Sequence, residues 1–281
     1  MIQRIGQYKD KPYTLERYDS IDEFLGEVES RPFIGGYARH SNSKEIRSEN
    51  YKRADELGAK GYSDAKEQFV KGTKAKVGMS KAFRSQVSPR KRETVTSPCG
   101  CAPIVANALR GLPNSMIDIR RERIPKATKV VVNMSINWAT SARDITEAGK
   151  KIIAAVGKLE SEGIATEIIC TADKLLNYEQ YSSCGISIKN AGQAFNAARV
   201  SFSMSSPAFL RVFQWLQLMT NPNALYDDGF GSNVSYNLSD EELKDYYRTM
   251  YGKGIYLSLP RIVRRGQTEI DNAINEWKKG R

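Results

Sequence analysis

The chain has 281 residues, of which 40% are hydrophobic and 27% charged, and it is long enough for one large domain. No apolar run approaches the roughly 20 residues that cross a bilayer, and the start, MIQRIGQYKDK, lacks the apolar core of a secretory signal. The four cysteines include no pair of Cys-x-x-Cys motifs, which fits a reducing compartment, so we expect a cytoplasmic protein without a membrane partner.

The first part of the chain is predicted to be mainly helical. Ser20 stands three positions before Glu23, a capping pattern that predicts a short helix through the apolar residues that follow. Two further helices are predicted at about 46–57 and 63–70, beside a glycine that can end the first and a serine that can cap the second. We therefore predict a helical N-terminal region over residues 1–96.

A basic arm closes this region, and it is predicted to be a loop or an extended segment over about residues 71–96. From Lys60 to Val130 sixteen residues are basic and five are acidic, so this quarter of the chain carries the whole net charge of +11. Such a charge suggests contact with nucleic acid or an acidic protein surface, and a solvated face is the alternative. The residues predicted to contact the partner are Lys71, Lys74, Lys76, Lys81, Arg84, Arg90, Lys91 and Arg92.

The stretch after the arm is predicted to contain a short helix and a strand. Pro103 stands where the first helical residue would be, which predicts a helix over about 104–110, and a strand is predicted at 116–121. Cys99 and Cys101 are separated by one residue, and ordinary apolar packing is favoured over a metal or redox site.

The most regular stretch of the sequence is predicted to form a β-α-β unit. The apolar runs at 129–134 and 164–170 are the predicted strands. Between them, apolar residues recur every three or four positions over about eighteen residues and a glycine follows, which predicts an amphipathic helix. Because one helix joins the two strands, we predict that the strands are parallel, with a crossover between them.

The rest of the chain continues the alternation of helices and strands. Strands are predicted at 185–189 and 254–259. Helices are predicted at 208–219, where the sequence is strongly apolar, after a capping box that begins at Ser239, and at 268–278. Alternating helices and strands predict an α/β fold with three layers.

A polar corner follows the strands of the β-α-β unit. Asn133, Ser135 and Asn137 come at the end of the first strand, with Thr140 beyond them, and Asp173 follows the second strand. Ligands of open parallel sheets bind beyond the carboxyl ends of the strands. These five residues are therefore the predicted ligand corner, although Asp173 can equally cap the next helix.

The order of this corner, the long helix and the second strand resembles a von Willebrand factor A domain. The resemblance implies a three-layer, Rossmann-like parallel-sheet core over residues 97–281 and a corner that holds a divalent ion through Asp-x-Ser-x-Ser. Here Asn133 replaces the carboxylate and Asn137 replaces a hydroxyl. Because Mg²⁺ usually keeps at least one carboxylate ligand, we expect a degenerate corner without metal or cofactor, whose amides hydrogen-bond the loop.

Two motifs that flank this unit, APIVANALRGLPNSM and SSPAFLRVFQWLQL, resemble uncharacterised proteins encoded by tailed bacteriophages. The resemblance covers roughly Ser97 to Pro260. It implies a phage origin, and so a place in the host cytoplasm or in the virion, but no known reaction.

A non-enzymatic accessory or structural protein that binds a macromolecule through its basic arm is the favoured interpretation. The single histidine, His40, lies in a polar stretch without the pattern of a catalytic triad. One alternative is a metal- or nucleotide-dependent enzyme or binder that uses Asn133, Ser135, Asn137 and Asp173. Another is an inhibitor of a host protein. The sequence does not indicate an oligomeric state.

Overall fold

The computed structural model of this chain describes residues 1–31, 93–120, 127–136, 140–193, 195, 197–206, 209, 217, 220–221 and 232–280. The predicted helices at 46–57 and 63–70, His40 and all eight predicted contact residues of the basic arm lie outside these residues. Most of the predicted apolar helix at 208–219 also lies outside them.

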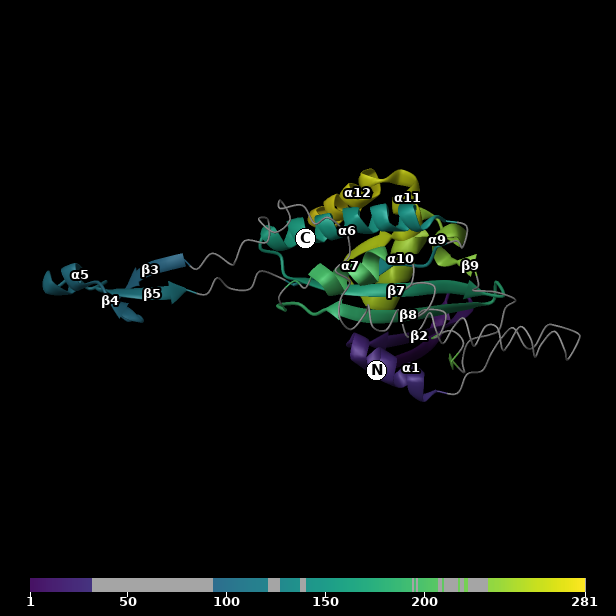
Figure 1. The fold of residues 1–281 in the computed structure, drawn as a ribbon, viewed down its shortest axis with the longest axis horizontal. Helices are drawn as coiled ribbons and strands as arrows, with labels where there is room; N and C mark the ends of the chain where they lie inside the picture. The colour runs from purple at the N-terminus through teal and green to yellow at the C-terminus, as the bar shows by residue number, and fades with distance from the viewer. Residues whose placement is uncertain are drawn as a thin grey trace, which may run out of the picture.

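Seven strands of the described chain form the main sheet, and six of them run side by side in the order β1-β2-β8-β7-β6-β10 (Figure 1). The pairs β2–β8, β7–β6 and β6–β10 are parallel, whereas β1–β2 and β8–β7 are antiparallel. The short strand β9 pairs with β7. The strands are β1 (Ile2–Tyr8), β2 (Lys11–Tyr18), β6 (Thr128–Asn133), β7 (Thr166–Leu176), β8 (Gln180–Lys189), β9 (Ser232–Asn233) and β10 (Ile255–Ser258).

The predicted β-α-β unit is confirmed. Strands β6 and β7 are adjacent and parallel, with Val131 opposite Ile169. Helix α6 (Ala142–Ser161) lies between them in the chain and begins at a cap, where the Ser141 side chain accepts a hydrogen bond from the backbone N–H of Asp144. The strand at 254–259 is confirmed as β10, and the helices after Ser239 and at 268–278 are confirmed as α10 (Asp240–Tyr251) and α12 (Gln267–Lys279).

The sheet is mixed, which corrects the prediction of a parallel core. Strand β7 continues into β8 through a short turn at Asn177 and Tyr178, and β1 continues into β2 through Lys9 and Asp10, so both pairs must be antiparallel. These four turn residues have φ between +48° and +61°. Asn-Gly or Asp-Gly normally marks such turns. Neither of these turns contains glycine, which is why the sequence did not indicate them.

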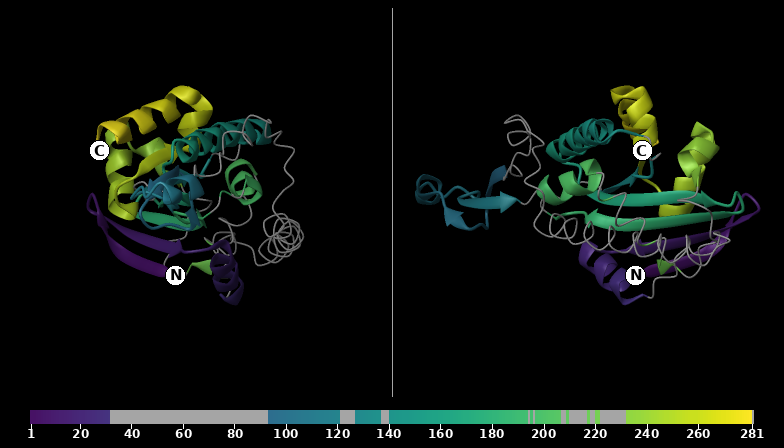
Figure 2. Two further views of the ribbon diagram at one scale, coloured as in Figure 1. Left: turned by 90° about the vertical axis from the view of Figure 1, so that its left-hand side faces the viewer. Right: turned by 45° about the vertical axis from the view of Figure 1, so that its right-hand side comes forward.

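Helices cover both faces of the main sheet (Figure 2). Side chains of a strand point alternately to the two faces. Val130 and Val132 accordingly belong to the same buried cluster as side chains of α1, α6, α7, α11 and α12, whereas Val131 belongs to the cluster that includes side chains of α9 and α10. No helix in the described ranges has the length and apolarity to cross a membrane. The remaining helices of this body are α1 (Ile21–Ser30), α7 (Ala197–Ser205), α9 (Val234–Asn237) and α11 (Leu259–Arg265).

Residues 1–31 differ from the mainly helical region that the sequence predicts. Strands β1 and β2 precede α1 and belong to the main sheet, because β2 pairs with β8. Helix α1 itself is confirmed, and the Ser20 hydroxyl accepts a 3.0 Å hydrogen bond from the backbone N–H of Glu23. It packs on the sheet through Phe24, whose ring centroid lies 5.1 Å from that of Tyr18. The main sheet therefore takes strands from both sides of the predicted domain boundary.

Residues 93–120 form a separate antiparallel sheet in the order β3-β5-β4, which Figure 1 shows beside the main body. Its helix and its strand β5 confirm the prediction for this stretch, although Pro103 belongs to β4 rather than to the helix. The elements are β3 (Glu93–Ser97), β4 (Ala102–Pro103), α5 (Val105–Leu109) and β5 (Met116–Arg120).

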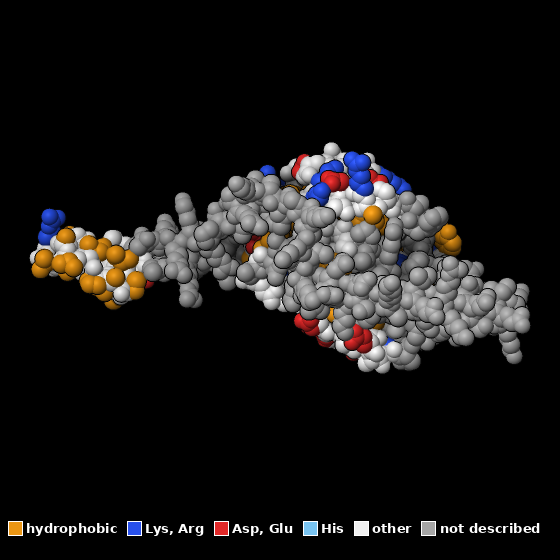
Figure 3. Space-filling model, in the orientation of Figure 1, with side chains coloured by type: hydrophobic (Ala, Val, Ile, Leu, Met, Phe, Trp, Pro, Cys, Tyr) orange, Lys and Arg blue, Asp and Glu red, His pale blue; other side chains and the backbone are white. Residues whose placement is uncertain are grey.

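This small sheet has no core of its own among the described side chains, since none from residue 96 to 118 is buried. Val105, Leu109 and Leu112 are 64%, 83% and 46% exposed, and Figure 3 shows the apolar surface of this part of the chain in orange. Cys99 and Cys101 are exposed as well, which corrects their expected apolar packing.

Gly149 allows α6 to lie very close to α7. A Cβ atom at this position would stand 2.3 Å from the carbonyl oxygen of Met204. We expect Gly149→Ala to lower the free energy of unfolding by about 1–3 kcal/mol, because the two helix backbones must move apart. Urea denaturation followed by circular dichroism measures this change.

Gly26→Ala is the matched control for this prediction. Gly26 lies inside α1, and a Cβ atom there would meet nothing within 4 Å. The substitution should raise the free energy of unfolding by about 0.5–1 kcal/mol, because alanine loses less backbone entropy in a helix. Equal effects of the two substitutions would contradict the close contact between α6 and α7.

Candidate functional site

The predicted polar corner lies at the carboxyl end of β6, on the face of the sheet that α10 covers. Asn133 stands opposite Thr171 of β7 on one side and Ser258 of β10 on the other. Asp173 stands opposite Ser183 of β8. The corner therefore collects polar side chains from four neighbouring strands.

The side chain of Asn133 joins two segments that are far apart in the sequence. Its Nδ2 group donates to Ser235 Oγ at 3.3 Å and to Asn233 Oδ1 at 3.4 Å. Its Oδ1 atom accepts a 2.8 Å hydrogen bond from the backbone N–H of Ser135. Asn233 acts in the same way, because its Oδ1 accepts from the N–H of Ser235 at 2.8 Å and its Nδ2 donates to the carbonyl of Ser135. Two asparagines thus hold the loop after β6 against the start of α9.

Asp173 is the carboxylate of this corner. Its two carboxyl oxygens accept hydrogen bonds from the hydroxyls of Thr171 and Ser183. Its backbone N–H donates to Ser135 Oγ at 3.0 Å, which links it to the loop after β6. The Ser183 hydroxyl lies 2.6 Å from the hydroxyl of Tyr251, so the network continues into α10.

The carboxyl group of Asp173 is unusual because it is completely buried. Burial raises its pKa to about 6, while hydrogen bonding by Ser183 and Thr171 and the nearby Tyr246 hydroxyl act in the opposite direction. Among the described residues the Tyr246 hydroxyl makes no hydrogen bond of normal geometry. Removal from water disfavours the ionised carboxylate, so this group takes up a proton much closer to neutral pH than an exposed aspartate does.

The structure brings Asn133, Ser135 and Asp173 together, although Asp173 lies inside β7 rather than after the strand or at a helix cap. Their exposed fractions are 0%, 4% and 0%, so the corner is closed to solvent and its polar groups bond one another. Thr140 is half-buried, and Asn137 lies outside the described residues. The predicted role of the Asn133 amide in bonding the loop has direct geometric support, whereas ligand binding at the corner stays a prediction.

No cluster of three or more His, Cys, Asp or Glu side chains that could hold a metal ion occurs in the described part of the chain. The polar partners that complete the corner come from segments that sequence reasoning did not connect with it. Asn233 and Ser235 lie about a hundred positions after Asn133 in the sequence, and Ser258 comes later still. The capping box at Ser239 predicted α10, but no local signal shows which face of the sheet a helix covers.

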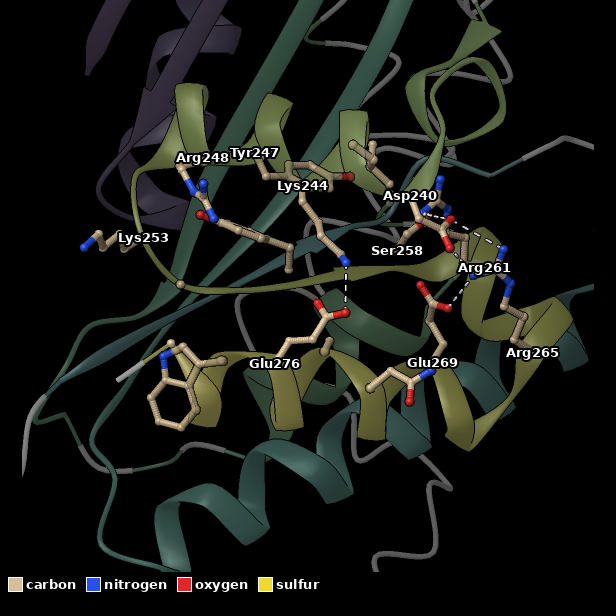
Figure 4. Close-up of a pocket in the computed structure, with 17 residues that line it drawn as sticks. Asp240, Lys244, Tyr247, Arg248, Lys253, Ser258, Arg261, Arg265, Glu269 and Glu276 are labelled. Carbon is tan, nitrogen blue, oxygen red and sulfur yellow. Dashed lines mark hydrogen bonds and ion pairs between the residues drawn. The ribbon is translucent and has the colours of Figure 1, made fainter.

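A pocket of about 560 Å³ lies between α10, β10 and α12, along the edge of the sheet (Figure 4). Its lining includes Tyr247 and Ser258, and the Ser258 hydroxyl donates to Ser235 Oγ at 2.8 Å. The pocket therefore shares a wall with the buried corner. Lys244 of α10 contacts Glu276 of α12 at 2.9 Å across the edge strand.

Comparison with known proteins adds a family but no activity. A family model described as "Domain of unknown function (DUF7192)" matches residues 5–273. The chain belongs to the DUF7192 family. The DUF7192 match spans both sheets, from β1 to α12. No curated protein and no solved structure matches the chain. The expected relation to von Willebrand factor A domains and the expected phage origin therefore have no support.

Asp173→Asn tests the buried carboxyl group. The pKa of Asp173 rises from 3.8 to about 6 on folding, so its contribution to stability is complete below about pH 4 and is lost as the pH rises through about 6. The shift corresponds to on the order of 3 kcal/mol. Denaturant titrations measure the difference in the free energy of unfolding between wild type and variant. This difference, wild type minus variant, should fall by on the order of 3 kcal/mol between about pH 4 and pH 7.

Asp271→Asn is the control, because Asp271 is an exposed carboxylate of α12. The difference in the free energy of unfolding between the wild type and Asp271→Asn should change little over the same pH range. A difference for Asp173→Asn that is equally flat would show that this carboxyl is not buried in the folded protein.

Proposed function

We propose that this protein is a non-enzymatic binding protein of the cytoplasm whose partner is nucleic acid, contacted through its phosphates by the basic arm. The observation that carries this proposal is the position of the charge: Lys60 to Val130 accounts for the whole net charge of +11. A polyanion is attracted to such a segment and releases counterions when it binds. The proposed contact residues are Lys71, Lys74, Lys76, Lys81, Arg84, Arg90, Lys91 and Arg92.

Nucleic acid is favoured over an acidic protein surface because the arm contains few aromatic and large apolar side chains. Protein interfaces usually centre on buried aromatic and apolar side chains. The arm from Lys71 to Arg92 has Phe83 as its one aromatic residue and few large apolar residues. Contacts with phosphate need only cations, and they do not require base stacking.

The described corner supports an enzymatic function less well. Asn133, Ser135 and Asp173 are buried, and their polar groups already bond one another or neighbouring side chains. A reacting group needs a place for a substrate within hydrogen-bond reach. This arrangement therefore favours binding over catalysis and a structural role for the corner.

Charge reversal in the arm tests the proposal. We expect replacement of Lys74, Lys76, Arg84 and Lys91 by glutamate to weaken binding of a labelled DNA duplex by at least about 100-fold at low salt. The slope of the logarithm of the binding constant against the logarithm of the salt concentration should become shallower by about 3–4. Each lost phosphate contact reduces the size of this slope by about 0.9. Fluorescence anisotropy over a series of salt concentrations measures both quantities.

The matched control reverses four exposed cations of the main body: Arg4, Lys151, Lys158 and Lys279. Affinity should change far less in this control, although its net charge changes by the same amount. Equal losses in both variants, or binding that high salt does not weaken, would contradict contact through the arm. Tighter binding of polyglutamate than of DNA would favour an acidic protein as the partner.

A further inference from the structure

The pocket between α10, β10 and α12 contains more positive charge than its own carboxylates neutralise. Five of its lining residues are basic and three are acidic, which leaves an excess of two positive charges. The basic residues are Lys244, Arg248, Lys253, Arg261 and Arg265, and the acidic residues are Asp240, Glu269 and Glu276.

The ion pairs inside the pocket show where this excess lies. Lys244 pairs with Glu276 at 2.9 Å. Arg261 pairs with Asp240 at 2.6 Å, and Arg265 contacts the same carboxylate at 3.0 Å. Arg265 also contacts Glu269 at 3.1 Å. Within the described chain, Arg248 and Lys253 are the lining cations that form no ion pair.

Arg248 and Lys253 lie at the same end of the pocket, opposite the end that holds Arg261 and Arg265 (Figure 4). Both are exposed, so an incoming anion competes with no carboxylate of the described chain for them, although Arg248 hydrogen-bonds the side chain of Tyr256. Arg248 belongs to the last turn of α10, and Lys253 follows Gly252, whose φ of +78° turns the chain back toward β10. The cations are therefore placed by the helix end and the turn.

An aromatic surface adjoins these two cations. The half-buried Tyr256 lines the pocket, and its ring is stacked on Tyr247 with centroids 5.5 Å apart and an angle of 24° between the planes. The Tyr256 hydroxyl donates to the carbonyl of Gly252, which holds the ring beside the turn. Trp277 of α12 also lines the pocket.

We propose that this pocket binds a mononucleotide, with the phosphate at Arg248 and Lys253 and the base against Tyr256. Two cations without a carboxylate partner match the charge of a phosphate dianion, and arginine binds phosphate oxygens in a bidentate manner. Stacking on an aromatic ring is a recurring way to hold a base. The volume of about 560 Å³ lies within the roughly 300–1,000 Å³ of small-molecule sites. This site is independent of the basic arm and goes beyond the proposed binding of nucleic acid.

Isothermal titration calorimetry with AMP, adenosine and inorganic phosphate tests the proposal. AMP should bind saturably and more tightly than either of its parts. Replacing Arg248 and Lys253 together by glutamine should weaken AMP binding by at least about tenfold, because two charge-assisted contacts are lost. Replacing Arg4 and Lys279 by glutamine, both exposed and outside the pocket, should leave AMP binding unchanged. No saturable binding of AMP, or equal binding by both variants, would overturn the proposal.

Substitution of Tyr256 tests the position of the base. Tyr256→Phe keeps the ring and loses the hydrogen bond to Gly252, so AMP affinity should be largely retained. Tyr256→Ala should weaken AMP more than it weakens inorganic phosphate, because only AMP has a base to stack. Equal losses for the two ligands would overturn the assignment of the ring.

The phosphate at this site could come from a free nucleotide or from a nucleic acid strand, and a long oligonucleotide distinguishes the two. The variant with Arg248 and Lys253 replaced should bind the oligonucleotide as the wild type does, and AMP binding should survive charge reversal in the basic arm. Equal losses of AMP and oligonucleotide binding on replacement of Arg248 and Lys253 would instead assign the pocket to the strand and contradict a mononucleotide site.

Discussion

The parallel pairing of β6 with β7 is the constraint on which the rest of the structure depends. This register puts Asn133 opposite Thr171, and it brings the loop after β6 close enough for Ser135 to accept a hydrogen bond from the backbone of Asp173. It also sends Val131 toward α10 while its neighbours face α6. A shift by one residue would exchange the two faces and place the polar corner under the other helices.

The buried corner shows how the fold accommodates a carboxylate away from water. Hydroxyls of Thr171 and Ser183 donate to Asp173, and asparagines from two distant segments bond the loop beside it. A buried polar network whose groups are all hydrogen-bonded makes one arrangement of the core much more stable than the alternatives. The corner therefore connects β6, β7 and the segment that leads into α10. Among the described residues, charged side chains that a ligand can reach line the neighbouring pocket.

Local patterns predicted much of this fold, and the limits of the prediction are physical. The caps at Ser20 and Ser239 and the period of α6 are local signals, and they placed these helices correctly. The hairpins at Lys9 and Asn177 use positive φ without glycine, so the usual marker was absent and a parallel sheet was expected. Three residues of the corner were predicted from their position after strands, whereas partners such as Asn233 and Ser258 depend on packing between distant segments.

The buried corner and the nucleotide pocket both depend on the main sheet, because β6 carries Asn133 and its parallel neighbour β10 lines the pocket. Contacts between β6 and β7 in an NMR spectrum of the isotope-labelled protein test that sheet most directly. Amide protons near Val131 should show cross-peaks to Hα protons near Ile169, and close Hα–Hα cross-peaks should be confined, for β7, to its antiparallel partners β8 and β9. Hα–Hα cross-peaks between β6 and β7, or no contact between them, would contradict the topology and the corner built on it.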